Sequence, residues 1–196
     1  MIIVLLRPLS WSPPGVDPSR WRMALAEDVV DLLATLSEVE PAIAATVADR
    51  ALAEAVAWPS MRVYDVAEAT VNAALAAAEA DGFEQAVVIA PDVPDVPGLV
   101  LGKLLRPLTT RLVAVAPAER EAGLLGVASR LPAPDWLPAI DLDGDAPAIV
   151  RKAAPRPNDV AVTPAWRRLR GPADLATLDP AVEGWDATRL LLTAGA

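Results

Sequence analysis

Residues 85–95 read QAVVIAPDVPD, an apolar run that passes directly into a proline-containing turn with two carboxylates. Small and β-branched side chains of this kind fill a strand that is buried on both faces of a sheet, so Gln85–Ala90 is predicted to be a central strand. Proline cannot continue the hydrogen-bond ladder, which ends the strand at Pro91. The stretch therefore predicts a parallel sheet with Asp92 and Asp95 just beyond the carboxyl end of one buried strand.

The segments around this strand alternate between strand and helix patterns. Short apolar runs predict strands, whereas runs with an apolar face or a high alanine content predict helices. The predicted strands are Met1–Leu6, Pro41–Val47, Arg62–Val66, Gln85–Ala90 and Arg111–Ala116. The predicted helices are Arg20–Leu36, Ala51–Val56, Ala69–Ala80 and Leu99–Leu105. This order is typical of an α/β domain with a doubly wound, mainly parallel sheet, which binds ligands where the strands end in loops 7–19, 91–98 and 117–126.

The second half of the chain, residues 117–196, has a less regular pattern. The predicted elements are helices at Ala146–Ala153, Gly171–Leu178 and Trp185–Thr193, a strand at Asp159–Thr163, and an irregular segment at Ala128–Trp136. No stretch has the composition of a domain linker. The 196 residues are therefore interpreted as one domain, 1–196, with the α/β pattern best supported over residues 1–116.

The chain contains no cysteine and no histidine. It therefore has no disulfide, no thiolate or Ser-His-Asp nucleophile, and no cysteine or histidine ligand for a zinc, haem or iron–sulfur site. A metal site would consist of oxygen ligands, which favours Mg²⁺ or Mn²⁺. Phosphoryl and nucleotidyl transfer fit these limits, because they depend on positioning and charge neutralisation more than on proton transfer.

Charge and hydropathy narrow the range of partners. The net charge is −9, which disfavours binding to nucleic acid. The longest apolar runs, such as Ile2–Leu6, are near five residues, whereas a membrane span needs roughly 20. Because no basic region precedes the first run, we expect a cytoplasmic protein without a membrane segment. The alanine-rich helices and the excess of apolar residues are compatible with a homodimer.

Residues 151–170 form a basic segment in this acidic chain. Its cations are Arg151, Lys152, Arg156, Arg167, Arg168 and Arg170, and its one acid is Asp159, which gives a local charge of +5. Such a run is either a solvated surface or a site for an anion such as phosphate. The sequence leaves both interpretations open.

The acidic run Asp141–Asp145 invites a calcium interpretation. The calcium-loop pattern needs a glutamate at its twelfth position, where this chain has Lys152, so the pattern fails. Alternating aspartate and apolar residues that end in glycine are instead interpreted as a strand end and a turn.

Two stretches resemble a known family. One is Val71-Asn72-Ala73-Ala74-Leu75, followed by a break at Asp81-Gly82, the apolar strand and Asp92-Val93-Pro94; the other is Leu5-Leu6-Arg7-Pro8-Leu9. Together they resemble the 2-phospholactate guanylyltransferases and the wider group of small bacterial glycosyltransferase-A proteins, which includes the molybdenum-cofactor guanylyltransferases. The resemblance covers residues 1–116.

The resemblance implies a Rossmann-like, three-layer nucleotide-diphospho-sugar transferase fold with a mainly parallel sheet. It implies that a nucleotide or nucleotide sugar binds at the strand ends, with Arg7 near the phosphates, Asn72 near the nucleotide or acceptor, and Asp92 on a Mg²⁺ or Mn²⁺ ion. Asp95, in the same turn, is a second candidate metal ligand. The competing interpretations are structural: Arg7 in a surface salt bridge, Asp92 as a turn residue, Asp95 as the cap of the helix at 99–105, and Asn72 as a buried group bonded to a loop.

The sequence also departs from the family. The loop Ser10–Gly15 contains two prolines and one glycine, which makes a poor phosphate cradle because proline has no amide donor. Residues 117–123 match a later glycine-rich loop only in outline. The C-terminal pattern Asp-x-Asp-x-Pro-x-Asp-Leu matches Arg168–Leu175, in which Arg168 and Arg170 replace the first two acids. Cations oppose metal binding, so these arginines are either a phosphate clamp in place of the metal or the mark of a lost activity.

Three functions are compatible with the sequence. The first is an active nucleotidyl- or glycosyltransferase, which an acidic pocket at the strand ends would favour. The second is a catalytically degenerate pseudoenzyme that binds a nucleotide or a protein, which a pocket filled by Pro13-Pro14 or by tryptophan side chains would favour. The third is an unrelated α/β domain with a structural role, which a different strand order would favour.

Overall fold

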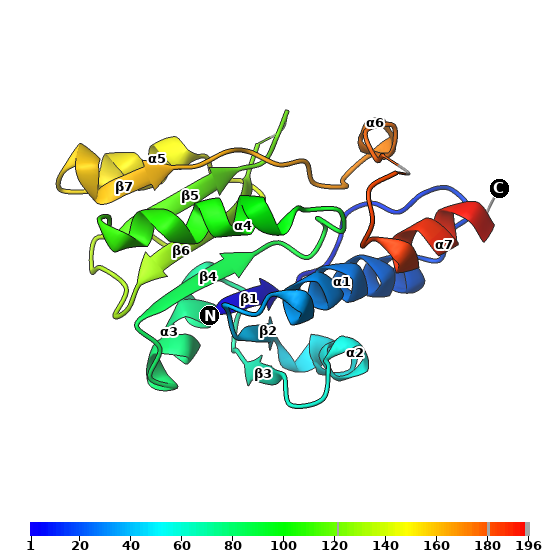
Figure 1. Cartoon of the computed structure of the whole chain (residues 1–196), viewed down its shortest axis with the longest axis horizontal. Helices are drawn as coiled ribbons and strands as arrows, with labels where there is room; N and C mark the ends of the chain where they lie inside the picture. Colours follow the sequence, from blue (N-terminus) through cyan, green and yellow to red (C-terminus); the bar gives the residue numbers. More distant parts are fainter. Residues whose placement is uncertain (121, 180, 195–196) are drawn as a thin grey trace.

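A computed structural model describes residues 1–120, 122–179 and 181–194. Its centre is a seven-stranded sheet in the order β3-β2-β1-β4-β6-β5-β7 (Figure 1). The strands are β1 (Ile2–Leu5), β2 (Pro41–Ala45), β3 (Arg62–Asp65), β4 (Gln85–Ile89), β5 (Val113–Pro117), β6 (Leu124–Arg130) and β7 (Val160–Val162). Strand β6 is antiparallel to both neighbours, and the other pairings among the described strands are parallel. The predicted mainly parallel sheet is confirmed.

Helices lie on both faces of the sheet (Figure 1). They are α1 (Pro18–Thr35), α2 (Arg50–Val56), α3 (Val71–Ala80), α4 (Gly98–Leu105), α5 (Pro147–Ala153), α6 (Pro172–Leu175) and α7 (Asp186–Ala194), with short 3₁₀ turns η1 (Val47–Asp49), η2 (Arg106–Thr109) and η3 (Pro157–Asp159). Helices α1 and α3 each begin at a cap from the side chain of their own N-cap residue. Asp17 accepts from the N–H of Arg20 at 2.9 Å, and Thr70 accepts from the N–H of Ala73 at 3.2 Å. Each cap satisfies a first-turn amide that has no partner inside its helix.

The apolar residues of the central strands alternate between two cores. In β1, Ile2 and Val4 belong to the core that contains α1, α2 and α4, whereas Ile3 and Leu5 belong to the core that contains α3 and α5. All four side chains are fully buried, as expected for a strand covered on both sides. The result is the expected three-layer domain, in which the carboxyl ends of β1 and β4 meet at one edge.

Strand β6 differs from the sequence prediction. The pattern predicts a loop at 117–126 and an irregular segment at Ala128–Trp136, but Leu124–Arg130 forms a strand between β4 and β5. Gly126, Pro132 and Pro134 explain the error, because glycine and proline are the residues that most often mark turns and loops. Here the glycine is needed for close packing, since a Cβ at this position would lie 2.7 Å from the carbonyl oxygen of Val88. Close approach of a neighbouring backbone is a known role of glycine in strands.

Most of the other predicted elements form with shifted ends, including the helices and strand of the second half. Helix α4 begins after Pro97 and receives no side-chain cap. The interpretation of Asp95 as the cap of this helix is therefore wrong. No helix in the part of the chain described above is long and apolar enough to cross a membrane.

Helix α7 packs along α1 (Figure 1). The buried carboxylate of Asp28 in α1 accepts from the N–H groups of Ala187 and Thr188, each at 2.9 Å. It therefore caps α7 from a different helix. Burial raises the pKa of Asp28 to about 6, although the hydrogen bonds from α7 oppose this shift. The position of the C-terminal helix thus depends on a titratable group.

Candidate functional site

The carboxyl ends of β1 and β4 lie side by side and border a cavity of about 230 Å³. Residues 141–143 and 168–170 reach the same edge of the sheet. The cavity is lined by Arg7, Pro8, Leu9, Ser10, Trp11, Pro91, Asp92, Asp143, Arg168, Leu169 and Arg170. The fold thus brings together four of the five predicted nucleotide-binding residues, all except Asn72.

The carboxylate of Asp92 is paired with the guanidinium group of Arg168. Nε donates to Oδ1 at 2.6 Å and Nη2 donates to Oδ2 at 3.0 Å, which is the bidentate arrangement. The two side chains are buried, with 2% of Asp92 and 3% of Arg168 exposed. Nη1 of Arg168 donates to the carbonyl oxygens of Leu124 at 3.1 Å and Leu142 at 2.7 Å. Removing Arg168 would leave the Asp92 carboxylate buried without its main partner, so the pair is held firmly.

A second carboxylate, that of Asp143, contacts three guanidinium groups. Oδ1 accepts from Nη2 of Arg168 at 2.8 Å and from Nη2 of Arg170 at 2.7 Å. Oδ2 lies 3.1 Å from Nη2 of Arg7, and the Asp143 side chain is 42% exposed. Arg7 is also paired with Asp141, at 2.7 Å. The three arginines are therefore linked through one partly exposed carboxylate.

These side chains form an arginine–aspartate cluster with no net charge. Its members are Arg7, Arg168, Arg170, Asp92, Asp141 and Asp143. Burial raises the pKa of Asp92, and the guanidinium group of Arg168 opposes this shift. Burial also acts on Asp141, but the N–H of Asp143 and the guanidinium group of Arg7 outweigh it and lower the pKa of Asp141. An anion that enters this neutral site must compete with the carboxylates already there.

The residues at the predicted metal site do not fit a divalent ion. Mg²⁺ and Mn²⁺ need carboxylate oxygens that are free to coordinate, but Arg168 engages both oxygens of Asp92. Asp95 accepts from Nε1 of Trp166 at 3.2 Å and forms an ion pair with Arg167, so its oxygens are engaged as well. Within the described residues there is no group of three or more acidic side chains that could hold a metal ion. The nearby guanidinium groups would also repel a dication.

The loop after β1 forms one wall of the cavity. Nε of Arg22 in α1 donates to the carbonyl oxygen of Arg7 at 2.9 Å, which fixes the start of the loop. Trp11 packs edge-on against the buried Trp21, with ring centroids 6.0 Å apart. The backbone N–H groups of Leu9–Ser12 donate to no acceptor among the residues that the structure describes. They are therefore available to solvent or to a ligand.

Asn72 lies on α3 and does not line the cavity. Its Nδ2 donates to the carbonyl oxygen of Pro138, and its Oδ1 accepts from the N–H of Ile140, each at 3.1 Å. These contacts match the interpretation of Asn72 as a polar group bonded to a loop. They fix the segment that leads into Asp141 and Asp143.

The basic segment 151–170 divides into two parts. The exposed cations, on or beside α5, are Arg151, Lys152 and Arg156. The cations paired with carboxylates at the edge of the sheet are Arg167, Arg168 and Arg170. The solvated-surface interpretation therefore describes the first part, and only the second part belongs to the candidate site.

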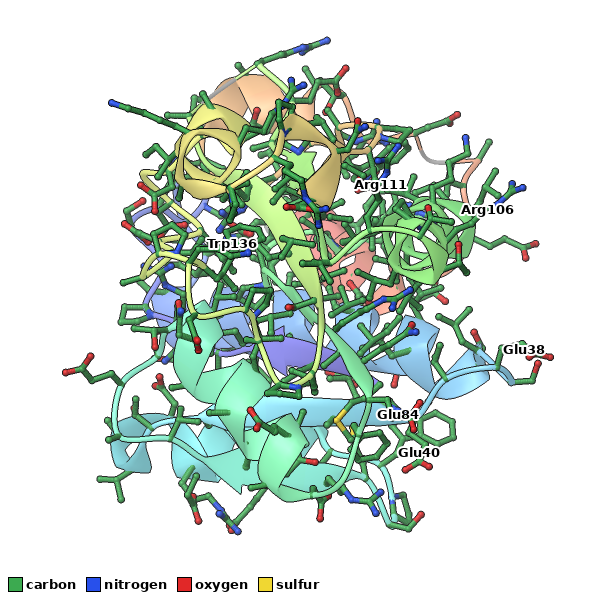
Figure 2. All side chains as sticks on the ribbon, turned by 90° about the vertical axis from the view of Figure 1, so that its left-hand side faces the viewer. Glu38, Glu40, Glu84, Arg106, Arg111 and Trp136 are labelled. Atoms are coloured by element: carbon green, nitrogen blue, oxygen red, sulfur yellow. The ribbon has the colours of Figure 1, made fainter. Side chains whose placement is uncertain are left out.

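Figure 2 shows the opposite edge of the sheet, where the parallel strands begin. Glu38, Glu40 and Glu84 lie in the lower right of this view, and Arg106 and Arg111 lie above them. These charged residues are separated from the arginine–aspartate cluster by the length of the strands. They take no part in the candidate site.

Sequence reasoning does not identify Asp141, Asp143 or Gly123 as site residues. The acidic run is visible in the sequence, but only the fold places it beside Arg7. Gly123 has a φ of +109°, and a Cβ there would lie 2.5 Å from the carbonyl oxygen of Leu142. Glycine tolerates both the positive φ and the close contact, and a glycine between the charged stretch 119–121 and the apolar pair Leu124-Leu125 is the one signal that could have revealed it.

Comparisons with known proteins agree with this architecture. No protein-family model matches the sequence, and no curated protein matches it significantly. Among solved structures, the chain is similar to a protein from Desulfovibrio desulfuricans G20 described as a nucleotide-diphospho-sugar transferase, with 17% identity, a TM-score of 0.67, and coverage of 99% of this chain and 96% of that chain.

Two synthases are similar over nearly their whole length. The 4-diphosphocytidyl-2C-methyl-D-erythritol synthase of Anaerococcus prevotii DSM 20548 has 10% identity and a TM-score of 0.58, and the match covers 97% of this chain and 94% of that chain. The CMP:2-keto-3-deoxy-manno-octonic acid synthetase, solved with CTP, has 11% identity and a TM-score of 0.54, and the match covers 100% of this chain and 98% of that chain. At these identities the likeness shows the fold. The chain therefore has the nucleotide-diphospho-sugar transferase fold, as the sequence resemblance implied.

Proposed function

Because the chain has the nucleotide-diphospho-sugar transferase fold, we propose that it binds the phosphate groups of a nucleotide or nucleotide sugar without a divalent metal and without transferring them. The observation that supports this proposal is the Asp92–Arg168 pair, in which a guanidinium group engages the carboxylate expected to hold the metal. Catalysis of phosphoryl and nucleotidyl transfer consists largely of positioning and of neutralising charge at the reacting phosphorus, where the metal acts. A site in which a guanidinium group already neutralises the metal-binding carboxylate can still bind a nucleotide but no longer transfer its phosphate group.

The chain's own donors would supply the contacts to phosphate. Arg7 and Arg170 line the cavity, and 19% and 15% of their side chains are exposed. Guanidinium groups form charge-assisted, bidentate hydrogen bonds to phosphate oxygens. The unpaired N–H groups of Leu9–Ser12 would add donors that carry no formal charge. Together these groups would contact the phosphate oxygens that a metal ion would otherwise coordinate.

The size of the cavity favours phosphate groups over a whole nucleotide. Its volume of about 230 Å³ is below the roughly 300–1,000 Å³ of sites that enclose drug-sized ligands. A second hollow of about 330 Å³ adjoins it along Pro8–Ser12 and extends to Arg22. We expect the ribose and base to lie in this hollow beside Trp11, since an aromatic face is a suitable surface for a base.

Isothermal titration calorimetry with GTP, CTP and a nucleotide sugar, each in EDTA and in Mg²⁺, tests the proposal. We expect binding in EDTA that weakens in Arg170→Gln by about 1.5–3 kcal/mol, or roughly 10- to 150-fold. Arg156→Gln is the matched control, because Arg156 belongs to the same basic segment but is 76% exposed and pairs outside the cluster. Its affinity is expected to equal that of the wild type.

Two results of this titration would contradict the proposal. Binding that requires Mg²⁺, together with release of pyrophosphate from a nucleoside triphosphate, would contradict the proposal and restore the active transferase. Absence of binding to every nucleotide in both buffers would refute the nucleotide-binding proposal. The remaining candidate would then be an interaction module for a protein partner.

A further inference from the structure

We infer that the carboxylate of Asp143 is an internal anion that occupies the phosphate site of the unliganded protein, and that a phosphate group binds by displacing it. This inference rests on the proposed function and adds regulation to the same site. Three features of Asp143 support it: the number of cations it contacts, the exposure of its side chain, and the way its backbone is held.

Asp143 has the surroundings that a phosphate group requires. Its two oxygens contact three guanidinium groups at 2.7–3.1 Å. One comes from Arg7 in the loop after β1, and the others come from Arg168 and Arg170 in the segment before α6. No other carboxylate in the described part of the chain pairs with three arginines. Guanidinium groups that converge on one anion favour a ligand with more oxygens and more charge than a carboxylate.

The two carboxylates that contact Arg168 differ in exposure. The Asp92 side chain is 2% exposed, whereas that of Asp143 is 42% exposed. Water can solvate the Asp143 carboxylate as soon as it leaves the arginines, so its release has a small cost. Release of Asp92 would leave a buried charge without a partner. A ligand is therefore expected to displace Asp143 and to leave the Asp92–Arg168 pair intact.

The backbone of Asp143 is held, so only its side chain needs to move. The preceding Leu142 is fully buried, and its carbonyl oxygen accepts from the N–H of Leu124 at 2.8 Å and from Arg168 at 2.7 Å. Gly123 packs against the same backbone, where a Cβ would lie 2.9 Å from the carbonyl oxygen of Asp143. Rotation of a partly exposed side chain is fast and requires no opening of the loop.

The exchange of anions changes the charge balance in favour of phosphate. Without the Asp143 carboxylate, the cluster contains three arginines and the two carboxylates of Asp92 and Asp141, a net charge of +1. A phosphate monoester carries about −1.5 to −2 at neutral pH, whereas a carboxylate carries a single charge. The expected ligand is thus a phosphate-type anion, because a monocarboxylate would gain nothing over Asp143.

Titration of inorganic pyrophosphate into the full chain in EDTA tests the displacement. Asp143→Asn removes the internal charge with little change of shape, and Asp135→Asn makes the same change of charge at an exposed residue outside the cluster. We expect Asp143→Asn to bind pyrophosphate about tenfold more tightly than the wild type, and Asp135→Asn to bind it with wild-type affinity. Asp141→Asn, which frees only Arg7, is expected to show a smaller gain in affinity for pyrophosphate. It replaces Asp143→Asn as the test variant if Asp143→Asn folds poorly.

Three results would overturn the inference. Equal affinity for pyrophosphate or nucleotide in the wild type and in both cluster variants would show that the carboxylate does not compete, and would leave the proposed function in place. An equal gain in Asp135→Asn would assign the effect to net charge alone. Absence of binding in every variant, to pyrophosphate and to nucleotides, would refute the proposed function together with the inference.

Discussion

Replacing Arg168 with methionine is expected to destabilise the protein by about 3–5 kcal/mol. The arginine side chain is 3% exposed, and its removal leaves the Asp92 carboxylate buried with only Arg170 nearby, at 3.5 Å. Methionine fills much of the same volume, so the loss is mainly electrostatic. The converse change, Asp92→Asn, is expected to cost less, about 1–3 kcal/mol, because Arg168 keeps Asp143 and two carbonyl oxygens as acceptors.

The double variant isolates the interaction between the two charges. Asp92→Asn with Arg168→Met removes both members of the pair, so its destabilisation is expected to be smaller than the sum of the single effects by about 2 kcal/mol. Urea denaturation followed by tryptophan fluorescence measures these differences. For a chain of this size, each kcal/mol also lowers Tm by roughly 2–4 °C. Arg50→Met is the control, because Arg50 pairs with the exposed carboxylates of Glu54 and Asp65 and its loss is expected to change stability little.

Two results would refute this reasoning. Strict additivity of the single changes would mean that Asp92 and Arg168 do not stabilise each other. A loss below about 1 kcal/mol in Arg168→Met would mean that the Asp92 carboxylate is solvated or protonated without cost, as in an exposed ion pair. In either case the pair could not be described as the buried centre of the cluster.

Three further predictions concern the C-terminal helix, the glycine contact and the metal. Burial raises the pKa of Asp28 from 3.8 to about 6, so the folded protein holds a proton that the unfolded chain releases between these values. The free energy of unfolding is expected to fall by up to about 3 kcal/mol as the pH rises from about 4 to about 6. Urea titrations across this pH range, in the wild type and in Asp28→Asn, measure this change. An equal dependence of the unfolding free energy on pH in both proteins would contradict it. Gly123→Ala is expected to lower stability by about 2 kcal/mol or more, because its φ and the contact with Leu142 exclude a Cβ, and an unchanged Tm would show that the loop relaxes. Mg²⁺ or Mn²⁺ is expected to leave the Tm of the wild type unchanged, whereas a rise that disappears in Asp92→Asn would restore the predicted metal site.

The fold could be predicted wherever local pattern decides the structure. Gln85–Ala90 and Met1–Leu6 are buried apolar runs that end at a proline or a charged residue, and both contain the expected strand. Strand β6 could not be predicted, because its place between β5 and β4 depends on pairing with β4, which is distant in the sequence. This pairing is permitted by the close approach of Gly126 to Val88. The only trace of that contact in the local sequence is the glycine itself, which is also common in turns.

The site could be predicted residue by residue but not as a set of contacts. Arg7, Asp92 and Arg168 stand at motif positions, and the fold brings them to one cavity. That Arg168 neutralises Asp92 depends on the segment before α6 returning to the end of β4, which is a tertiary contact. Asp143 has no motif position, and its acidic run is also typical of an ordinary turn.

The Asp92–Arg168 pair also determines how this edge of the sheet responds to its surroundings. A metal ion held by a carboxylate exchanges with the solvent, and its occupancy follows its free concentration. A guanidinium group that belongs to the chain has an effective concentration set by the fold, which dilution does not change. Chelators, dialysis or a fall in the concentration of Mg²⁺ would therefore leave the Asp92–Arg168 pair at the strand ends assembled, so this pair is expected to be the same at any concentration of free metal.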